Sequence, residues 1–232
     1  MKILVTGANR GLGLSLVEAG LERGHVLIAT FRSRKQEDLE KLNSLKQKFE
    51  EHLHLIPMDV TDEMSIREAK KKLEEITPAI DGIINNAGIL LGREQKVEEV
   101  DVNDCKKCMD INALGPLRVV KHFLSLLKKG INPAIVNISS DAASLTNAYD
   151  GDYPYTLSKA ALNMLTEKWR VSLKEEGFLV CSVHPGWMKT EMGGKQAPLN
   201  PRESAEGIFD IMERKIEIYS SYVDYRGKAM PL

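Results

Sequence analysis

The sequence predicts a doubly wound α/β fold, in which a parallel sheet of about seven strands is covered by helices on both faces. Short apolar segments of strand length alternate with longer amphipathic segments of helix length along the whole chain. The apolar segments are nearly continuous, as they are in parallel strands buried on both faces. The first of them runs directly into a glycine-rich turn that opens a helix, which makes the expected fold Rossmann-like.

The strands are expected where aliphatic runs are bounded by polar or glycine residues. Six buried strands and one candidate edge strand near the C-terminus are expected at residues 3–6, 26–31, 53–58, 82–85, 134–139, 179–184 and 219–225. Helices are expected at residues 12–23, 35–50, 63–76, 103–129, 154–176 and 204–217. Asp62 and Pro154 are suited to helix starts, because aspartate caps a first turn and proline fits the first helical position. No repeat, linker or low-complexity tract interrupts this alternation, so one domain covering residues 1–232 is expected.

Composition excludes several functional classes. The 232 residues include 32 Lys and Arg against 33 Asp and Glu, which argues against a broadly basic surface for nucleic acid. Hydrophobic residues make up 43% and charged residues 28%, as in ordinary globular proteins. No apolar run reaches the roughly 18 residues of a membrane span, and the N-terminal run is too short for a signal peptide. Three cysteines give no disulfide framework, so a soluble protein of the reducing cytoplasm is expected, without membrane or nucleic-acid partners.

The glycine-rich turn reads Thr-Gly-Ala-Asn-Arg-Gly-Leu-Gly at residues 6–13. Its glycines let the backbone approach a pyrophosphate, which then lies on free N–H groups at a helix N-terminus. The turn lacks the Gly-Lys-Ser/Thr ending of a P-loop, and a tight connection without ligand is the alternative interpretation. The expected dinucleotide contacts are Gly7, Asn9, Arg10, Gly11, Leu12 and Gly13.

The end of the second strand predicts which dinucleotide is bound. An NAD site places an acid there for the ribose 2′-hydroxyl, whereas an NADP site needs positive charge for the 2′-phosphate. The chain has Thr-Phe-Arg-Ser-Arg at residues 30–34 and no acid before Glu37. Arg32 is therefore the expected phosphate ligand, with Arg10 closing over the same group, and the cofactor is expected to be NADP(H). Two surface arginines without a ligand are the alternative.

Tyr155 and Lys159 are four positions apart inside a predicted helix, which places them on one helical face. A tyrosine hydroxyl has a pKa near 10, so it exchanges protons poorly at pH 7 unless its anion is stabilised. The Lys159 ammonium and an oxidised nicotinamide are expected to lower that pKa. The pair alone is a weak signal, because most such pairs are surface residues.

Taken together, these motifs resemble those of the short-chain dehydrogenase/reductase family over essentially the whole chain. The turn matches the family pattern T-G-x-x-x-G-x-G, and residues 85–88 match its N-N-A-G signature. The resemblance implies further cofactor contacts at Asp59, Val60, Asn86, Ala87, Gly88, Pro185, Gly186 and Thr190, besides Tyr155 and Lys159. It also implies a catalytic set of Asn112, Ser140, Tyr155 and Lys159, with Ser139 as a minor rival of Ser140.

Within the family, residues 184–194 and 222–227 resemble the branch of sniffer carbonyl reductases and C-factor-like proteins. This similarity implies a carbonyl reductase, in which NADPH gives hydride to the carbonyl carbon and Tyr155 gives a proton to its oxygen. Ser140 would orient the carbonyl, Lys159 would bind the nicotinamide ribose and tune Tyr155, and Asn112 would hold a water. Ser140 lies 15 positions before Tyr155, a longer spacing than is commonest in the family.

The substrate is expected among the loops at residues 89–102, 141–153 and 187–200. The candidate pocket side chains are Leu90, Leu91, Tyr153, Trp187, Met188 and Met192, of which the last three are equally well explained as core residues. Asp141, Asp150 and Asp152 lie nearby, so an apolar or aromatic aldehyde, ketone or quinone is expected rather than a strong anion.

Alternative functions stay open at this stage. One is reduction of a 3-oxoacyl group on an acyl carrier protein, and another is a non-catalytic NADP-binding signalling or regulatory protein. A further alternative is a reductase that also has a signalling role. A homodimer or homotetramer is possible through the helices at 103–129 and 154–176.

Several residues suggest sites but are better explained structurally. Cys105 and Cys108 have C-x-x-C spacing within a helix and lack a second pair, so no metal is expected. His52 and His54 are expected to share one face of the third strand without a ligand partner. His184, at a strand end, is better explained by a structural role than a catalytic one.

Overall fold

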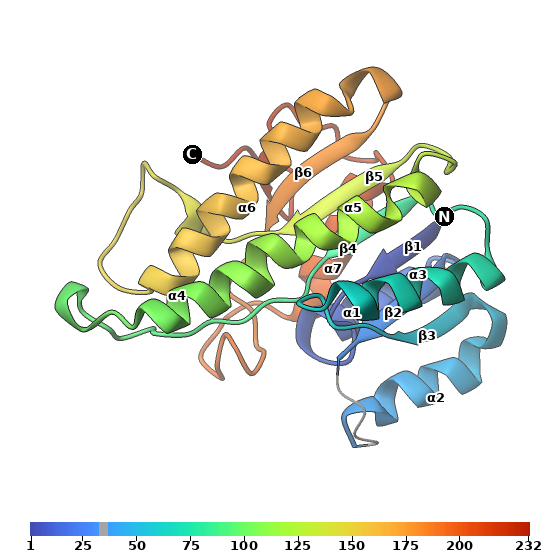
Figure 1. Ribbon diagram of the computed structural model, residues 1–232, viewed down its shortest axis with the longest axis horizontal. Coiled ribbons are helices and arrows are strands. Elements are labelled where there is room, and N and C mark those ends of the chain that lie inside the picture. The colour runs from blue at the N-terminus through green and yellow to red at the C-terminus, as the bar shows by residue number, and fades with distance from the viewer. Residues whose placement is uncertain (33–36) are drawn as a thin grey trace.

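The computed structural model describes residues 1–32 and 37–232, apart from the side chain of Asp38. Within these residues, seven parallel strands form one sheet in the order β3-β2-β1-β4-β5-β6-β7 (Figure 1). The strands are β1 Lys2–Val5, β2 Val26–Phe31, β3 Leu53–Pro57, β4 Gly82–Asn85, β5 Ala134–Ile138, β6 Leu179–His184 and β7 Tyr222–Asp224. The doubly wound parallel sheet predicted from the sequence is confirmed.

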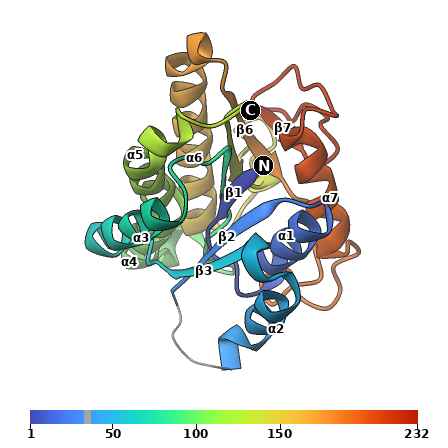
Figure 2. The ribbon, with the colours of Figure 1, turned by 90° about the vertical axis from the view of Figure 1, so that its right-hand side faces the viewer.

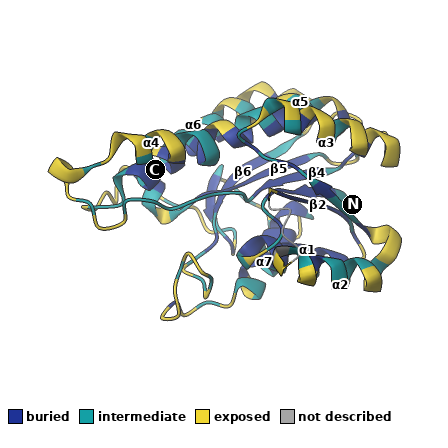
Figure 3. Cartoon of the chain, turned by 60° about the horizontal axis from the view of Figure 1, so that its bottom comes forward, coloured by how far each residue is buried: buried dark blue, intermediate teal, exposed yellow. Residues whose placement is uncertain are grey.

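Helices cover both faces of the sheet (Figures 2 and 3). One layer holds α1 Gly11–Glu22, α2 Glu40–Phe49 and α7 Pro201–Met212; the other holds α3 Glu63–Ile76, α4 Val102–Met109, α5 Gly115–Leu127 and α6 Tyr153–Ser172. Alternate side chains of each strand enter the two layers, so that Ile3 and Val5 join one apolar core and Leu4 joins the other. Both cores are fully buried, which explains why the strand sequences are apolar throughout.

Most element bounds agree with the sequence predictions within a few residues, but the helix expected at 103–129 is divided. A π-helical segment, Asp110–Leu114, separates α4 from α5. The helix expected at 154–176 ends at Ser172 and continues as a 3-10 turn, Lys174–Glu176. The helix expected at 35–50 is described only from the 3-10 turn Glu37–Leu39 onward, because residues 33–36 lie outside the described part of the chain.

Near the C-terminus two boundaries differ for local reasons. Helix α7 begins at Pro201, earlier than predicted, because the side chain of Asn200 accepts a hydrogen bond from the N–H of Arg202 and Pro201 fits the first turn. The edge strand β7 is shorter than predicted and pairs in parallel with β6. No described helix is both long and apolar enough to cross a membrane.

The chain reverses its direction of winding at β1, which lies between β2 and β4. Strand order reverses at such a switch point, and the helices that follow the two neighbouring strands leave on opposite faces of the sheet. A crevice therefore opens at the carboxyl ends of the strands. The glycine turn, Arg32, Asp59, Asn86, Ser140 and Pro185 all follow strand ends at this edge.

Candidate active site

The glycine turn between β1 and α1 is held in a conformation that only glycine allows at two positions. Gly7 has a φ of +63°, and a Cβ at Gly13 would lie 2.1 Å from the carbonyl oxygen of Gly7. The Asn86 side chain supports the turn by donating to the carbonyls of Thr6 and Gly7. Arg10, the N-cap of α1, makes no side-chain cap, so the first N–H groups of the helix are directed to the crevice. An anion such as a pyrophosphate fits these donors.

Arg32 lies exposed at the end of β2, beside a cavity of about 280 Å³. The wall on the β3 side contains Met58, Asp59 and Asp62. Both carboxylates are engaged locally, since Asp59 accepts from the N–H and hydroxyl of Thr61, and Asp62 caps α3. A carboxylate-lined wall suits an adenine amino group, whereas the guanidinium of Arg32 suits a phosphate.

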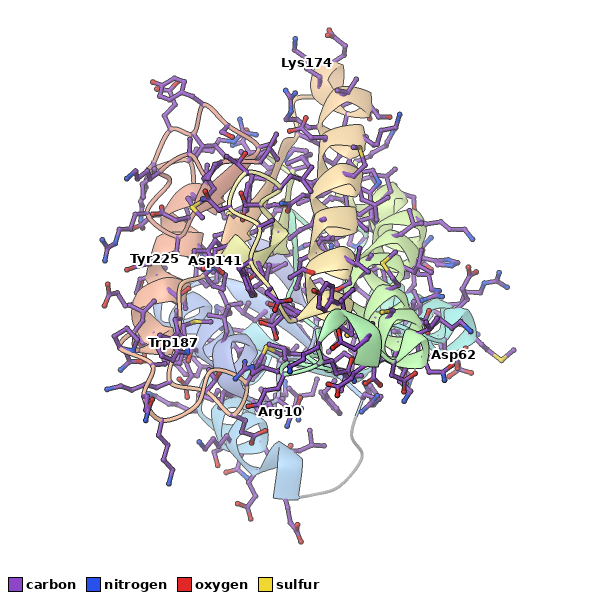
Figure 4. The ribbon with its side chains drawn as sticks, turned by 90° about the vertical axis from the view of Figure 1, so that its left-hand side faces the viewer. Arg10, Asp62, Asp141, Lys174, Trp187 and Tyr225 are labelled. Atoms are coloured by element: carbon purple, nitrogen blue, oxygen red, sulfur yellow. The ribbon has the colours of Figure 1, made fainter. Side chains whose placement is uncertain are left out.

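Arg10 does not reach toward Arg32. Its guanidinium forms an ion pair with Glu191, in the loop after β6. Figure 4 views the protein toward the carboxyl ends of the strands, with Arg10 labelled at this edge. Glu191 thus holds Arg10 in this structure, and the expectation that both arginines close over one phosphate stays a prediction.

The N-N-A-G segment links the glycine turn to the catalytic residues. The N–H groups of Asn86 and Ala87 both donate to the hydroxyl of Thr6, at 3.0 Å each. A Cβ at Gly88 would lie 3.2 Å from Asn112 Oδ1 and 3.7 Å from Lys159 Nζ. The backbone at Gly88 therefore passes directly against two of the predicted catalytic side chains.

Asn112 is fully buried in the π-helical segment between α4 and α5. Its amide donates to the carbonyl of Ile89 and to the Ser158 hydroxyl, both at 2.9 Å, and its oxygen accepts from the N–H of Ile89 at 2.8 Å. Single π turns are frequent at functional sites, because they place one extra residue on a helix. Here the segment turns a polar side chain into the interior, where it joins the loop after β4 to helix α6.

Tyr155 lies in the first turn of α6 and is 9% exposed. Burial raises the pKa of its phenol to about 12, while a hydrogen bond with Ser140 opposes that rise. The described residues together therefore raise this pKa, and the lowering expected from Lys159 with an oxidised nicotinamide stays a prediction. The pKa rises because burial removes water from the phenolate, and this effect is larger than the lowering by the hydrogen bond with Ser140. A phenol that stays protonated at pH 7 is suited to donating a proton.

Lys159 is also buried, one helical turn beyond Tyr155. Its Nζ donates to the carbonyl of Ile138, the last residue of β5, at 2.6 Å, and lies 5.6 Å from the centre of the Tyr155 ring. Burial lowers the pKa of Lys159 from its ordinary 10.5 to about 8. The side chain is thus fixed between the strand end and the phenol, where it can also bind a ribose hydroxyl.

This pKa shift predicts a measurable effect of pH on stability. Between pH 8 and 10.5 the unfolded chain keeps the Lys159 proton and the folded chain loses it, so the free energy of unfolding rises with pH. From pH 8 to 9.5 the wild type should gain about 1.5 kcal/mol relative to Lys159→Met, which lacks the titrating group. Urea denaturation of both proteins at the two pH values measures this. Equal changes in both proteins would contradict the shift.

The serine that follows β5 lies near enough to Tyr155 to affect the pKa of its phenol. Ser140 Oγ donates to Asp141 Oδ1 at 2.9 Å and accepts from the N–H of Ala142 at 3.2 Å. Ser139 instead points inward and donates to Asn163 Oδ1 at 2.7 Å. Because Ser139 is buried and already bonded, this geometry favours Ser140 as the active serine over its neighbour.

The segment after β6 turns at Gly186, which has a φ of +81°. Pro185 is buried, and the hydroxyl of Thr190 accepts from the N–H of Gly193. Thr190 also lies over the glycine turn, because a Cβ at Gly11 would come within 3.6 Å of it. These positions fit a segment that covers part of a bound dinucleotide, as the resemblance implied.

The predicted substrate residues are spread over three loops. The indole of Trp187 is exposed and donates to the carbonyl of Gly193, whereas Met188 packs partly buried against the core. Tyr153 donates to Asp150 at 2.6 Å, and Arg93 donates to the carbonyl of Met192 at 3.1 Å. Leu90 and Leu91 are half-buried in the loop after β4. Their common role as a pocket stays a prediction.

A small apolar cavity of about 130 Å³ lies between the 141–149 loop and α6. Its lining includes Leu145, Tyr149 and Leu157; Leu145 belongs to a loop where the substrate is expected, and the other two were not among the predicted pocket residues. Sequence reasoning also missed Ser158, which joins Asn112 to α6, and Tyr222, whose hydroxyl donates to the carbonyl of Ser140 at 2.5 Å. One indication of Ser158 was present in the sequence, namely its position directly before Lys159. Tyr222 lies in the segment 222–227 that resembles one branch of the family, but that resemblance assigned it no contact or role.

The other polar candidates do not form sites among the described residues. Cys105 and Cys108 are free thiols on α4, and burial raises the pKa of Cys108. His52 belongs to the 3-10 turn Glu50–His52 and not to β3, so it does not share a strand face with His54 as predicted. No cluster of three or more potential metal ligands occurs in residues 1–32 and 37–232.

Comparison with known proteins identifies the family. The family model described as short chain dehydrogenase matches residues 1–200. The chain belongs to the short-chain dehydrogenase/reductase family. It is therefore an oxidoreductase by family membership, and the order of its glycine turn, N-N-A-G segment, serine, tyrosine and lysine is that of the family.

Among curated relatives of this short-chain dehydrogenase/reductase, the C-signal protein of Myxococcus xanthus is 37% identical over 157 residues, which cover 67% of this chain and 94% of that protein. An NADPH-bound carbonyl reductase from chicken fatty liver has a TM-score of 0.89 and 32% identity, covering 100% of this chain and 98% of that one. Carbonyl reductase Sniffer of D. melanogaster has a TM-score of 0.91 and 30% identity, covering 100% and 99%.

Proposed function

We propose that the protein is an NADPH-dependent carbonyl reductase that converts an apolar or aromatic aldehyde, ketone or quinone to the alcohol. The observation that carries the proposal is the buried pair of Tyr155 and Lys159, with Lys159 Nζ 5.6 Å from the centre of the phenol ring and Ser140 near enough to lower the pKa of the phenol. Asn112 extends this cluster through Ser158. The cluster adjoins the glycine turn through Gly88, so a cofactor on the turn would meet the same groups.

The donors at the carboxyl edge fit NADP(H). The first N–H groups of α1 would take the pyrophosphate, and Arg32 would take the 2′-phosphate. Asp59 and Val60 would border the adenine, and Asn86, Ala87, Gly186 and Thr190 would border the nicotinamide half. The NADPH-bound relative from chicken fatty liver, similar over the whole chain, supports this assignment.

When bound, the reduced nicotinamide supplies the hydride that adds to the carbonyl carbon. The Tyr155 phenol and the Ser140 hydroxyl, once the latter turns from Asp141, would both donate to the negative charge that develops on the carbonyl oxygen. The phenol then gives its proton to that oxygen, and the buried Lys159 ammonium stabilises the phenolate that is left. Asn112 fixes the backbone at Ile89 and the Ser158 hydroxyl, which keeps this side of α6 in place for reprotonation from solvent.

The charges around the site favour neutral substrates. Asp141, Asp150 and Asp152 lie on the 141–152 segment beside Ser140 and Tyr155, and Asp141 and Asp152 raise the pKa of Tyr155. An acidic acyl carrier protein would be repelled by this side of the site, which argues against a 3-oxoacyl reductase. The intact Tyr155 and Lys159 argue against a non-catalytic regulator.

The test is NADPH oxidation with a panel of neutral aldehydes, ketones and quinones, compared with dicarboxylate ketones and 3-oxoacyl thioesters. We expect turnover of neutral carbonyls with NADPH and much weaker turnover of dianions. Preference for the dicarboxylates or thioesters would overturn the substrate assignment. Tight NADPH binding without turnover of any carbonyl would overturn the reductase assignment.

We also propose that the chain self-associates through α6 and the neighbouring α4 and α5. Leu157, Met164 and Val171 are exposed on α6 at intervals of seven residues, and therefore lie on one helical face. Replacing Met164 with glutamate places a charge in the middle of this apolar stripe and is expected to give monomers. Sedimentation velocity of the wild type and the variant measures this, and equal sedimentation coefficients would contradict it.

A further inference from the structure

The turn that carries Ser140 is held by the two strands beyond it. Tyr222, which is 1% exposed on β7, donates its hydroxyl to the carbonyl of Ser140 at 2.5 Å. The N–H of Asp141 donates to Nδ1 of His184, the last residue of β6, at 3.0 Å. The peptide group between Ser140 and Asp141 is thus bonded at both its carbonyl and its N–H.

The hydrogen bond from the N–H of Asp141 determines the protonation state of the His184 imidazole. Nδ1 can accept only when it carries no proton, so the His184 ring is neutral with its proton on Nε2. Burial lowers the pKa of His184 below its ordinary 6.5, while Asp141 and Asp224 on the neighbouring β7 oppose the shift. On the α6 side, the Lys159 ammonium is directed to the carbonyl of Ile138.

The Asp141 carboxylate connects this bond to the active serine. Asp141 Oδ1 accepts from the Ser140 hydroxyl at 2.9 Å and lies 3.7 Å from His184 Nδ1. A proton on His184 Nδ1 would repel the backbone N–H of Asp141, because both groups are donors, and would attract the Asp141 carboxylate. The carboxylate would then leave the Ser140 hydroxyl, and the turn could not keep its present conformation.

We propose that His184 is a positioning residue for the catalytic Ser140 and acts through the backbone N–H of Asp141. Tyr222 fixes the same peptide group through its hydrogen bond to the Ser140 carbonyl. This inference rests on the proposed function, because it assigns Ser140 to carbonyl orientation. His184 touches neither of the reacting groups. Its neutral ring keeps the Ser140 hydroxyl in place, and its protonation releases the turn.

A matched pair of variants separates this role from general stability. In His184→Asn, Oδ1 replaces Nδ1 as an acceptor that does not titrate, whereas His184→Leu leaves the N–H of Asp141 without its acceptor. We expect His184→Leu to lower kcat about tenfold with little change in the KM for NADPH. His184→Asn should keep kcat within about threefold of the wild type and should lose the acid-side decline of kcat below pH 6.5 that His184 causes.

A second readout needs neither cofactor nor turnover. In NMR titration of the full chain, the amide resonance of Asp141 should shift with the protonation of His184 in the wild type. In His184→Asn that shift should disappear, and only the shift from the Asp141 carboxyl itself should remain. Tyr222→Phe should lower kcat about fivefold and leave the His184 titration in place.

Ser140→Ala, measured beside these variants, separates the two proposals. If the wild type reduces no carbonyl, the proposed function fails. If Ser140→Ala keeps the turnover of an active wild type, the reductase assignment stands, but Ser140 is not an active serine and the positioning role of His184 fails. If Ser140→Ala is impaired but His184→Leu and the wild type have equal kcat and equal pH profiles, only the positioning role fails. An unchanged Asp141 titration in His184→Asn would also overturn it.

Discussion

Replacing Tyr155 with phenylalanine is expected to lower kcat by about 10³ while leaving the Kd for NADPH within about twofold. The phenol is 9% exposed, and burial keeps it protonated at neutral pH with a pKa of about 12. Phenylalanine keeps the ring that packs in α6 and removes only the hydroxyl. The loss corresponds to about 4 kcal/mol of transition-state stabilisation from the missing proton donor.

Two measurements check this prediction, namely steady-state kinetics with a neutral aldehyde and fluorescence titration with NADPH. Tyr219→Phe is the matched control, because it removes the same hydroxyl from an exposed tyrosine whose hydroxyl donates to Glu217. Its kcat should stay within about threefold of the wild type. A Tyr155→Phe enzyme that retains turnover would refute the assignment of Tyr155 as proton donor, whatever the substrate.

Much of the fold was predictable because its determinants are local. Buried parallel strands need apolar side chains on both faces, so runs such as residues 26–31 and 179–184 mark strands whose observed bounds match the prediction. The order of strands and glycine turn then placed the candidate residues at the carboxyl edge of the sheet. Tyr155 and Lys159 followed from helical spacing, and Asn112 and Ser140 only from resemblance to a family.

The remainder depends on contacts between distant segments. Asp141 meets His184 across 43 positions, and Arg10 meets Glu191 across 181 positions, without any pattern in the intervening sequence. The π-helical segment at Asn112 leaves no mark in composition, because it differs from an α-helix only in its hydrogen bonding. The rise that burial gives the pKa of Tyr155 could not be predicted from the sequence, because the extent of burial is a property of the folded chain.

Replacing Arg32 with aspartate should weaken NADPH binding about a hundredfold and NADH binding no more than about threefold. Charge-assisted hydrogen bonds to a phosphate contribute about 1.5–3 kcal/mol each, and the aspartate adds repulsion of the 2′-phosphate. NADH lacks this phosphate, and an acid at the end of β2 can accept from its ribose hydroxyl. Because Arg10 pairs with Glu191 in the structure, we expect Arg32 to account for most of the discrimination between the two cofactors.

Kd values for NADPH and NADH, measured by fluorescence at fixed ionic strength, test this selectivity. Arg214→Asp makes the same charge change at a residue bonded to the carbonyl of Gly177, which precedes β6 and so lies at the opposite edge of the sheet. It should change both Kd values by less than about twofold, because exposed charges farther away than a Debye length are screened. Equal losses for the two cofactors in Arg32→Asp would show that Arg32 does not bind the 2′-phosphate. In that case Arg10, released from Glu191, would be the next candidate, and Glu191→Gln would strengthen NADPH binding selectively.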